Sequence, residues 1–497
     1  MLVSRPRALS LYLCLVLGVV QGLALVLFGI KGAAVTLAAG YVFAVFRWPH
    51  LALIAALSII NGLDLFSAET VFHIPGVFKL KDLIFISLFL PLFLNARWQR
   101  RAKRIFRHCR VLAFPILAIL VLTTLQMIRT SLQYDLPLNS CIMAGRHYWY
   151  YAFVPLAAIY LDDPRKRDVT YTLFLLVISV LATVVIIQTI ILSQGGTLFV
   201  TGINLVGRSE WGSLSLARLF SAVAPALVLG FALAFWGGAL TQVTRKKIFY
   251  VFVVSLCVLA TLLMNSRMRW IHTFLVVLIP LAFLWPHLPR AGRRLGAAMC
   301  VLVLGVVLFS GWPDRRGSFL SGIGGRALSA WTDFRDKEGT WEYRLEDNQF
   351  RFELIREHPL FGLGFVHLDY AWRFGAGGEI KQADGSTYKR GVTSTDSGIV
   401  DLLVHLGAVG VIWAMWYFVS VLRFCSRMMK TMSPQSGLLG WVPIPLIAYM
   451  AGGVLTFVTL GLFTEAGDII SHSLVLGMLC AVPIVSSGLR TKKEVHI

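Results

Sequence analysis

The sequence predicts an all-α polytopic membrane protein with about fourteen transmembrane helices, and three observations lead to this fold class. First, 57% of the 497 residues are hydrophobic and only 14% are charged, with a mean hydropathy of +0.73, whereas soluble chains carry about a quarter charged residues. Second, apolar runs recur that are near the twenty or so residues needed to cross a bilayer. Third, the basic residues gather between these runs, which is typical of cytoplasmic anchors.

The apolar runs give the expected order of the helices. They lie at 9–29, 31–46, 49–66, 80–95, 111–128, 147–161, 169–193, 213–236, 248–265, 270–287, 295–312, 397–423, 441–463 and 470–489. The first run follows Arg5 and Arg7 as in a signal peptide, but it lacks a small-residue cleavage site and is expected to be a retained helix. Because strongly basic loops such as 97–110 are expected inside, both termini are predicted to be cytoplasmic.

One polar segment interrupts this pattern and divides the chain into three parts. Residues 1–312 are expected to hold helices 1–11, residues 313–396 to form one large periplasmic loop, and residues 397–497 to hold helices 12–14 and a short basic cytoplasmic tail. A loop of this length is usually functional. Its stretch 344–358 (RLEDNQFRFELIREH) is compatible with an amphipathic helix that ends at Pro359.

Charge and motifs exclude several functions. The net charge of +21 comes largely from the cytoplasmic clusters, so no nucleic-acid partner is expected. The seven cysteines form no CxxC pair, and only Cys141 falls in an expected external loop, which argues against a disulfide framework. The sequence contains no P-loop, HExxH or GxSxG motif. Since no cytosolic nucleotide is available on the outer face, a substrate used there must arrive already activated.

Arginines at the expected outer boundary are the first candidate site residues. Arg267 and Arg269 lie in a tight turn between two helices, against the positive-inside bias, which indicates an anionic partner. Snorkelling of Arg269 beside Trp270 is the alternative interpretation. Arg218 lies at the outer end of the run 213–236, where a charge is a functional hypothesis by default.

Two further features lie in and after the large loop. Arg344 precedes the segment 359–364 (PLFGLG), and Asp396 stands where the chain re-enters the membrane. Asp396 and Ser397 can also be read as an ordinary helix N-cap. His405 lies deeper in the same helix, where it can simply satisfy a polar contact.

In this order and topology, the motifs resemble those of the bacterial O-antigen ligase and O-antigen polymerase family. The matching positions are Arg218, Ser266-Arg267, Arg344, 359–364 and 407–410. The likeness spans about 200–410. The sequence departs at Asp396 and Ser397, which stand where ligases carry a His-Asn pair, and this departure favours a polysaccharide polymerase over a ligase.

The resemblance implies a bundle of the GT-C type that polymerises undecaprenyl-diphosphate-linked oligosaccharide at the periplasmic face of the bacterial inner membrane. Arg218 and Arg267, with Arg269 and Arg344 in reserve, would bind the diphosphate, because a guanidinium grips phosphate oxygens with two parallel hydrogen bonds. Asp396 is the candidate base or acceptor-orienting group, with His405 and His367 as rivals. Since arginines would replace a metal ion, no metal or other cofactor is expected.

The expected partners are the lipid-linked donor, an acceptor glycan and membrane lipids, together with a chain-length regulator or flippase. The first alternative function is an O-antigen ligase that transfers glycan to a lipid A-core acceptor. The second is a lipid-linked oligosaccharide flippase, although such transporters are usually built from repeated halves. The sugars, the linkage and the pathway do not follow from the sequence.

The topology makes a testable prediction. A cysteine introduced at Gly385 should react with a membrane-impermeant thiol reagent while the inner membrane is intact, because 313–396 is expected outside. A cysteine in the 97–110 loop is the matched control and should react only after permeabilisation. Labelling of the Gly385 position only after permeabilisation would contradict the topology.

Overall fold

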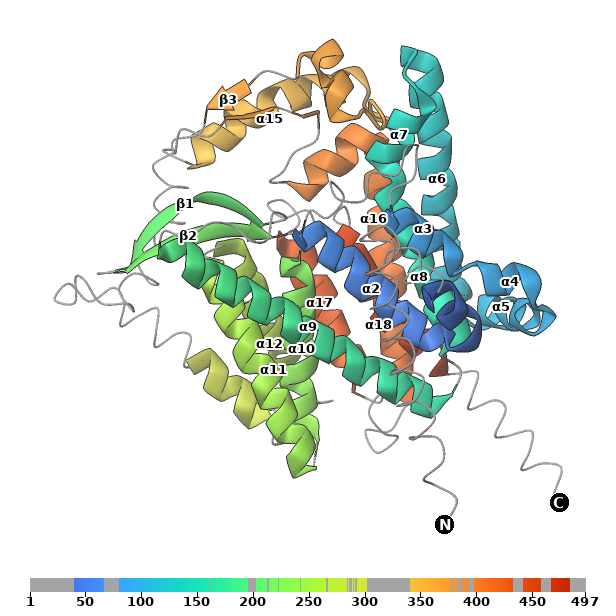
Figure 1. Cartoon of the computed structure of the whole chain (residues 1–497), viewed down its shortest axis with the longest axis vertical. Helices are drawn as coiled ribbons and strands as arrows, with labels where there is room; N and C mark the ends of the chain where they lie inside the picture. Colours follow the sequence, from blue (N-terminus) through green and yellow to red (C-terminus); the bar gives the residue numbers. More distant parts are fainter. Residues whose placement is uncertain are drawn as a thin grey trace, which may run out of the picture.

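The computed structural model describes residues 40–66, 80–161, 163–194, 203–301, 340–431, 441–456 and 466–482, with short gaps inside the 203–301 and 340–431 ranges. Most of these residues are helical (Figure 1). The first half contains α2 (Pro49–Phe66), α3 (Leu80–Ser87), α4 (Leu90–Leu94), α5 (Ala96–His108), α6 (Arg110–Tyr134), α7 (Leu138–Gly145), the 3-10 helix η2 (Arg146–Ala152), α8 (Phe153–Tyr160) and α9 (Pro164–Ser193). The second half contains α10 (Ala224–Leu240), α11 (Thr244–Leu263), α12 (Arg267–Phe283), α15 (Thr340–Glu357), the 3-10 helix η5 (Leu368–Phe374), α16 (Gly398–Thr431), α17 (Pro443–Thr456) and α18 (Ala466–Cys480).

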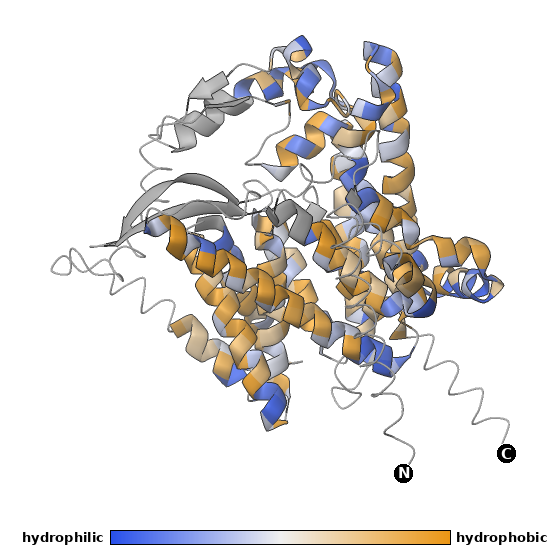
Figure 2. Ribbon diagram, in the orientation of Figure 1, coloured by the Kyte–Doolittle hydropathy of each residue, from blue (hydrophilic) through white to orange (hydrophobic). Residues whose placement is uncertain are grey.

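The helices have the composition of a membrane protein. Among the described residues, α6, α9, α11 and α16 are long and apolar enough to cross a bilayer, and five shorter apolar helices accompany them. Figure 2 shows apolar residues along most of the length of the long helices, with hydrophilic residues at their ends and on α5. The chain is therefore an integral membrane protein, whereas the number of fourteen spans and the topology stay predictions. The expected runs 9–29 and most of 31–46 and 295–312 lie outside the described residues.

Helix α6 shows how the sequence separates a lipid-facing side from a packed side. Large apolar side chains recur every three or four residues and are exposed, as expected for contact with lipid rather than with the core. They are Phe114, Leu117, Val121, Leu125, Ile128 and Leu132. The opposite side is buried and includes the polar residues Thr123, Gln126 and Thr130. These three side chains therefore point into the protein.

Three expected spans are divided in the structure. The run 80–95 forms α3 and α4, with Pro91 in the first turn of α4, where its missing N–H is tolerated. The run 147–161 consists of η2 followed by α8. The run 213–236 contains a strand, β2 (Leu214–Ser221), before α10, and proline at 225 lies in the first turn of α10.

Two small antiparallel sheets are the exceptions to the all-α expectation. Strand β1 (Ile203–Trp211) pairs with β2, and β3 (Glu379–Lys381) pairs with β4 (Thr387–Lys389). Only Gly212 and Ser213 separate β1 from β2, which is a length and composition typical of a tight hairpin turn. Strand β2 contacts α9 and α11. Arg218 therefore lies in a strand, opposite Gly207, rather than in a helix.

Helix α16 is interrupted at Gly407. The backbone there has φ 62° and ψ −154°, a region that is open to glycine almost alone. The interruption removes the usual helical acceptors of Ala408 and Val409. Their N–H groups donate instead to the carbonyl oxygens of Pro359, at 2.9 Å, and Leu360, at 3.2 Å. Backbone atoms of Pro359 and Leu360 thus replace the missing hydrogen bonds of the helix.

The same segment also serves the first half of α16. The carbonyl oxygen of Val404 accepts hydrogen bonds from the backbone N–H groups of Leu363, at 2.8 Å, and Gly364, at 3.2 Å. A Cβ atom on Gly362 would lie 2.5 Å from the Val404 oxygen, and one on Gly407 would lie 2.5 Å from the oxygen of Leu360. The two backbones therefore approach too closely for any side chain at Gly362 or Gly407. We call residues 359–365 the docked segment.

Helix α6 holds the docked segment from its other side. The Nε2 atom of Gln126 donates to the carbonyl oxygens of Phe361, at 2.7 Å, and His405, at 3.1 Å. The hydroxyl of Thr130 accepts from the N–H of Phe365 at 3.1 Å. The buried polar residues of α6 thus tie the docked segment and the interruption of α16 into one unit.

Substitution of Gly407 tests this arrangement. Gly407→Ala should destabilise the protein by about 1–3 kcal/mol through a backbone conformation that is open to glycine almost alone and by about 1–3 kcal/mol more through overpacking against the docked segment. Gly375→Ala is the matched control, because Gly375 has φ 76° but no atom within 4 Å of the added Cβ. Thermal unfolding in detergent should show a clearly larger loss for Gly407→Ala, and equal losses would contradict the close approach.

Candidate active site

A buried polar stripe runs down the first half of α16. Ser397, Asp401 and His405 are spaced four residues apart, so they lie on one side of the helix, and all three are buried. The Ser397 hydroxyl accepts from the N–H of Val400 at 3.5 Å. Asp401 lies in the first turn, where the helix dipole favours a negative charge. The polar stripe therefore begins beside the position of Asp396, which itself lies outside the described residues.

His405 lies inside a cluster of rings. Its ring centroid is 4.8 Å from that of Phe365 in the docked segment, 6.3 Å from that of Tyr148 and 6.5 Å from that of His147. Within the described part of the chain, both ring nitrogens of His405 and the hydroxyl of Tyr148 make no hydrogen bond. The carboxylate of Asp401 is close enough to Tyr148 to interact with it electrostatically. The buried ring nitrogens of His405 are therefore candidates for exchanging a proton or for binding a hydroxyl group.

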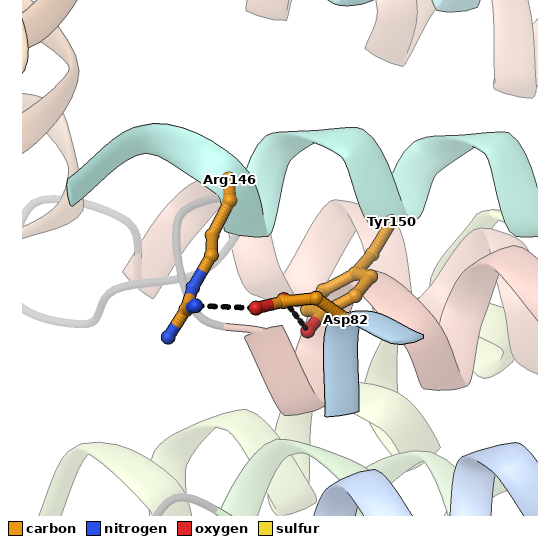
Figure 3. Close-up of polar contacts among 3 residues, drawn as sticks. All are labelled: Asp82, Arg146 and Tyr150. Atoms are coloured by element: carbon orange, nitrogen blue, oxygen red, sulfur yellow. Dashed lines mark hydrogen bonds and ion pairs between the residues drawn. The ribbon is translucent and has the colours of Figure 1, made fainter. Parts of the chain in front are cut away.

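Helix η2 supplies the neighbours of His405, and a buried ion pair fixes its start. Figure 3 shows Arg146 of η2 paired with Asp82 of α3, while the hydroxyl of Tyr150 donates to the other carboxylate oxygen of Asp82 at 3.3 Å. The side chains of Arg146 and Asp82 are 7% and 6% exposed. Lys81 and Arg146 both act electrostatically on His147. Cationic and titratable groups therefore gather where α3, η2 and α16 approach one another.

His367 lies in a different setting from His405. It caps η5, accepts a hydrogen bond from the N–H of Asp369 at 3.4 Å, and its Nδ1 atom lies 3.1 Å from the Asp369 carboxylate. The Asp369 side chain is 77% exposed, so this pair is solvated. No contact between His367 and His405 is present among the described residues. The two rival bases are therefore in chemically distinct places, one solvated and one buried.

Arg269 is buried within the bundle. It lies one turn before His272, and the charges of Arg269 and Asp468 both act on that histidine. The Nε2 atom of His272 lies 2.9 Å from the carbonyl oxygen of Tyr449, whose hydroxyl in turn bonds the Asp468 carboxylate. A snorkelling arginine places its charged group in water at the membrane surface. The burial of Arg269 therefore argues against this interpretation.

The other predicted arginines are located only by their backbone. Arg218 is in β2, Arg267 is the first residue of α12, and Arg344 is in α15. Their side chains, like Asp396, lie outside the described part of the structure. That these side chains converge on one substrate-binding site stays a prediction. Among the described residues, no three His, Cys, Asp or Glu side chains are grouped in a way that could hold a metal ion.

Sequence reasoning missed the residues of α3 and η2. The expected transmembrane runs or their edges include all of these residues, which are Asp82, Arg146, His147, Tyr148 and Tyr150. A signal was present, because a charged residue inside or at the edge of an apolar run is a functional hypothesis with a partner to be found. The runs 80–95 and 147–161 begin beside an acid and an arginine, which marks each residue as a candidate without showing that the two pair.

Residues 252–415 match the model of a family described as O-antigen ligase. No curated protein matches the chain. The matched range contains the second part of α11, all of α12 and α15, the docked segment and the interruption of α16, so it includes both motif segments that bond to each other. Over this range, about a third of the chain, the sequence is similar to the O-antigen ligase family.

Proposed function

We propose that this protein is a polymerase of surface polysaccharide at the periplasmic face of the bacterial inner membrane. It joins oligosaccharide repeat units that are carried on undecaprenyl diphosphate. The observation that carries the proposal is the direct bonding of the two motif segments, 359–364 and 407–410, beside the buried polar stripe of α16. Residues that the family resemblance singles out in the sequence are thus neighbours of groups able to handle protons.

The proposed reaction is one displacement at the anomeric carbon of the donor. A hydroxyl oxygen of the acceptor glycan forms the new bond to this carbon, and the bond from the carbon to the bridging oxygen of the lipid diphosphate breaks. The electron pair stays on the bridging oxygen, so the leaving group is the lipid diphosphate. The hydroxyl proton passes to a base. Negative charge thus grows on the bridging oxygen in the transition state, where fixed cations are most effective.

Arginines are the proposed cations. Arg218 and Arg267 bind the diphosphate, with Arg269 and Arg344 as further contacts, because the planar guanidinium matches two phosphate oxygens at once. They take the place of a metal ion, so turnover should persist in the presence of a chelator. Strict dependence on a divalent metal would overturn this part of the proposal.

Asp396 is the proposed base. It precedes Ser397 and the buried stripe, and a carboxylate can accept a proton from a sugar hydroxyl. His405 is the rival with the strongest structural support, since its ring nitrogens are buried and make no hydrogen bond within the described residues.

An O-antigen ligase is the second candidate function. It is favoured by the description of the matched family, O-antigen ligase. It is disfavoured by Asp396 and Ser397, which stand where ligases carry a His-Asn pair. The two functions differ only in the acceptor, which is a lipid A-core for the ligase and a second lipid-linked glycan for the polymerase. Supplying each acceptor separately to the purified protein distinguishes them.

Arginine substitutions test the diphosphate clamp. Arg218→Ala and Arg267→Ala should each lower the release of undecaprenyl diphosphate about 10²–10³-fold, the usual loss for one preorganised anion contact. Arg267→Lys should also be impaired, because an ammonium cannot form the paired hydrogen bonds. Arg294→Ala, at an exposed arginine in an expected cytoplasmic loop, is the control and should be near normal. Normal polymer length in both alanine variants, at matched protein levels, would refute the clamp.

Substitution of Asp396 tests the base. Asp396→Asn should abolish turnover but retain donor binding, because the amide keeps the size and hydrogen bonding of the carboxylate and loses its basicity. If Asp396 only caps the helix, asparagine is an equally good cap and activity survives. Asp396→His restores the residue that ligases carry and should retain partial activity. Full turnover by Asp396→Asn would move the role to His405 or His367, which His405→Gln and His367→Gln then separate.

A further inference from the structure

Helix η2 is fixed at its first residue by charges that the protein interior should disfavour. Arg146 and Asp82 are both buried and come from elements 64 residues apart in the chain. Removing two charges from water is costly, and apolar residues of similar size often stabilise a protein as well as a buried ion pair does. Buried ionisable residues in a membrane protein are therefore functional candidates together with their partner.

The ion pair is adjacent to the rings that contact His405. His147 and Tyr148 follow Arg146 directly, and Tyr148 contacts both His405 and Phe365, with a centroid distance of 5.6 Å to Phe365. Gly145, which precedes Arg146, packs so closely that an added Cβ would lie 2.7 Å from the Phe365 ring. The start of η2 is thus held between Asp82 on one side and the docked segment on the other. A shift of η2 would move Tyr148 relative to His405.

The orientation in Figure 3 supports this role. Arg146 reaches Asp82 from the start of η2, and Tyr150 reaches the same carboxylate from one turn further on. The ion pair joins the start of η2 to α3, and the contact of Tyr150 at 3.3 Å is the weaker of the two. Together with the close packing of Gly145 on Phe365, the ion pair fixes the rotation of η2 about its axis, and the rotation determines which rings face α16.

We propose that Asp82 and Arg146 are positioning residues of the glycosyl-transfer site, which orient η2 so that Tyr148 and His147 face His405. This inference rests on the proposed function, and neither residue is assigned by the family motifs. Neither residue touches substrate in this role. The ion pair sets the orientation of η2, and η2 sets the surroundings of His405.

A double-mutant cycle separates positioning from simple stabilisation. The variants are Asp82→Asn, Arg146→Gln and the double variant, which carries neither buried charge and so avoids leaving one of them unpaired. Tyr150→Phe is the matched control, because it removes the 3.3 Å hydrogen bond to Asp82 and keeps the ion pair. For each variant, the monodisperse fraction in detergent gives kcat and KM for release of undecaprenyl diphosphate. Modification of His405 by diethyl pyrocarbonate, measured by mass spectrometry, reports on η2 without any activity.

The expected result is a kcat per folded molecule that falls about 10- to 100-fold in each single variant, as for misplaced reacting groups, with KM for the donor nearly unchanged. The kcat of the double variant should be about as low as that of the less active single variant, because both substitutions break the same interaction. His405, protected in the parent protein, should become modified in these variants, whereas Tyr150→Phe stays near normal in both measurements. A normal kcat per folded molecule, or unchanged protection of His405, in the double variant overturns the proposal. If the parent protein releases no lipid diphosphate, the proposed function fails, and modification of His405 alone then decides whether the ion pair positions η2.

Discussion

The interruption of α16 at Gly407 is the constraint on which the surroundings of the candidate site depend. A helix that loses hydrogen bonds within a membrane protein must find partners for the freed groups, because unsatisfied backbone groups are costly there. Here the partners are backbone atoms of the docked segment, and side chains of α6 hold that segment in turn. The path of α16, the end of the large loop and the packed side of α6 are therefore determined together. His405 lies two residues before the interruption, so its placement follows from the same bonds.

Helix η2 joins two buried clusters. On one side, Tyr148 meets His405 and Phe365. On the other side, Tyr151 contacts Trp413, Tyr417 and His472, at centroid distances of 5.2, 5.2 and 5.7 Å. His472 in turn lies 3.4 Å from the Asp468 carboxylate. Ionisable and hydroxyl-bearing side chains thus extend through the bundle from the docked segment to α18. Burying such groups in a low-dielectric interior costs free energy. Their clustering therefore makes this part of the core a candidate for a functional role, and not only for stability.

The sequence predicted the membrane class and the similarity to the O-antigen ligase family, because both depend on composition and on the order of local motifs. It did not predict where expected spans divide. The run 213–236 is apolar enough for a helix, but its first part pairs with β1 as a strand. Periodicity alone cannot separate these outcomes for a short apolar run. The pairing of Asp82 with Arg146 depends on a tertiary contact over 64 residues, which one sequence does not reveal. Conversely, the glycines at 362, 364, 407 and 410 were recognised as motifs, but their mutual packing became evident only from the backbone geometry.

The docked segment precedes Gly407 in the chain, and this order bears on how the protein is made. During synthesis, residues 359–365 leave the ribosome before the second half of α16 does. The amide groups exposed by the interruption can therefore meet their acceptors as soon as the helix enters the bilayer. If the partner segment were synthesised later, the helix would have backbone N–H groups without hydrogen bonds in the bilayer, which is strongly unfavourable. The direction of translation thus makes the hydrogen-bond partners of this irregular helix available before its second half is synthesised.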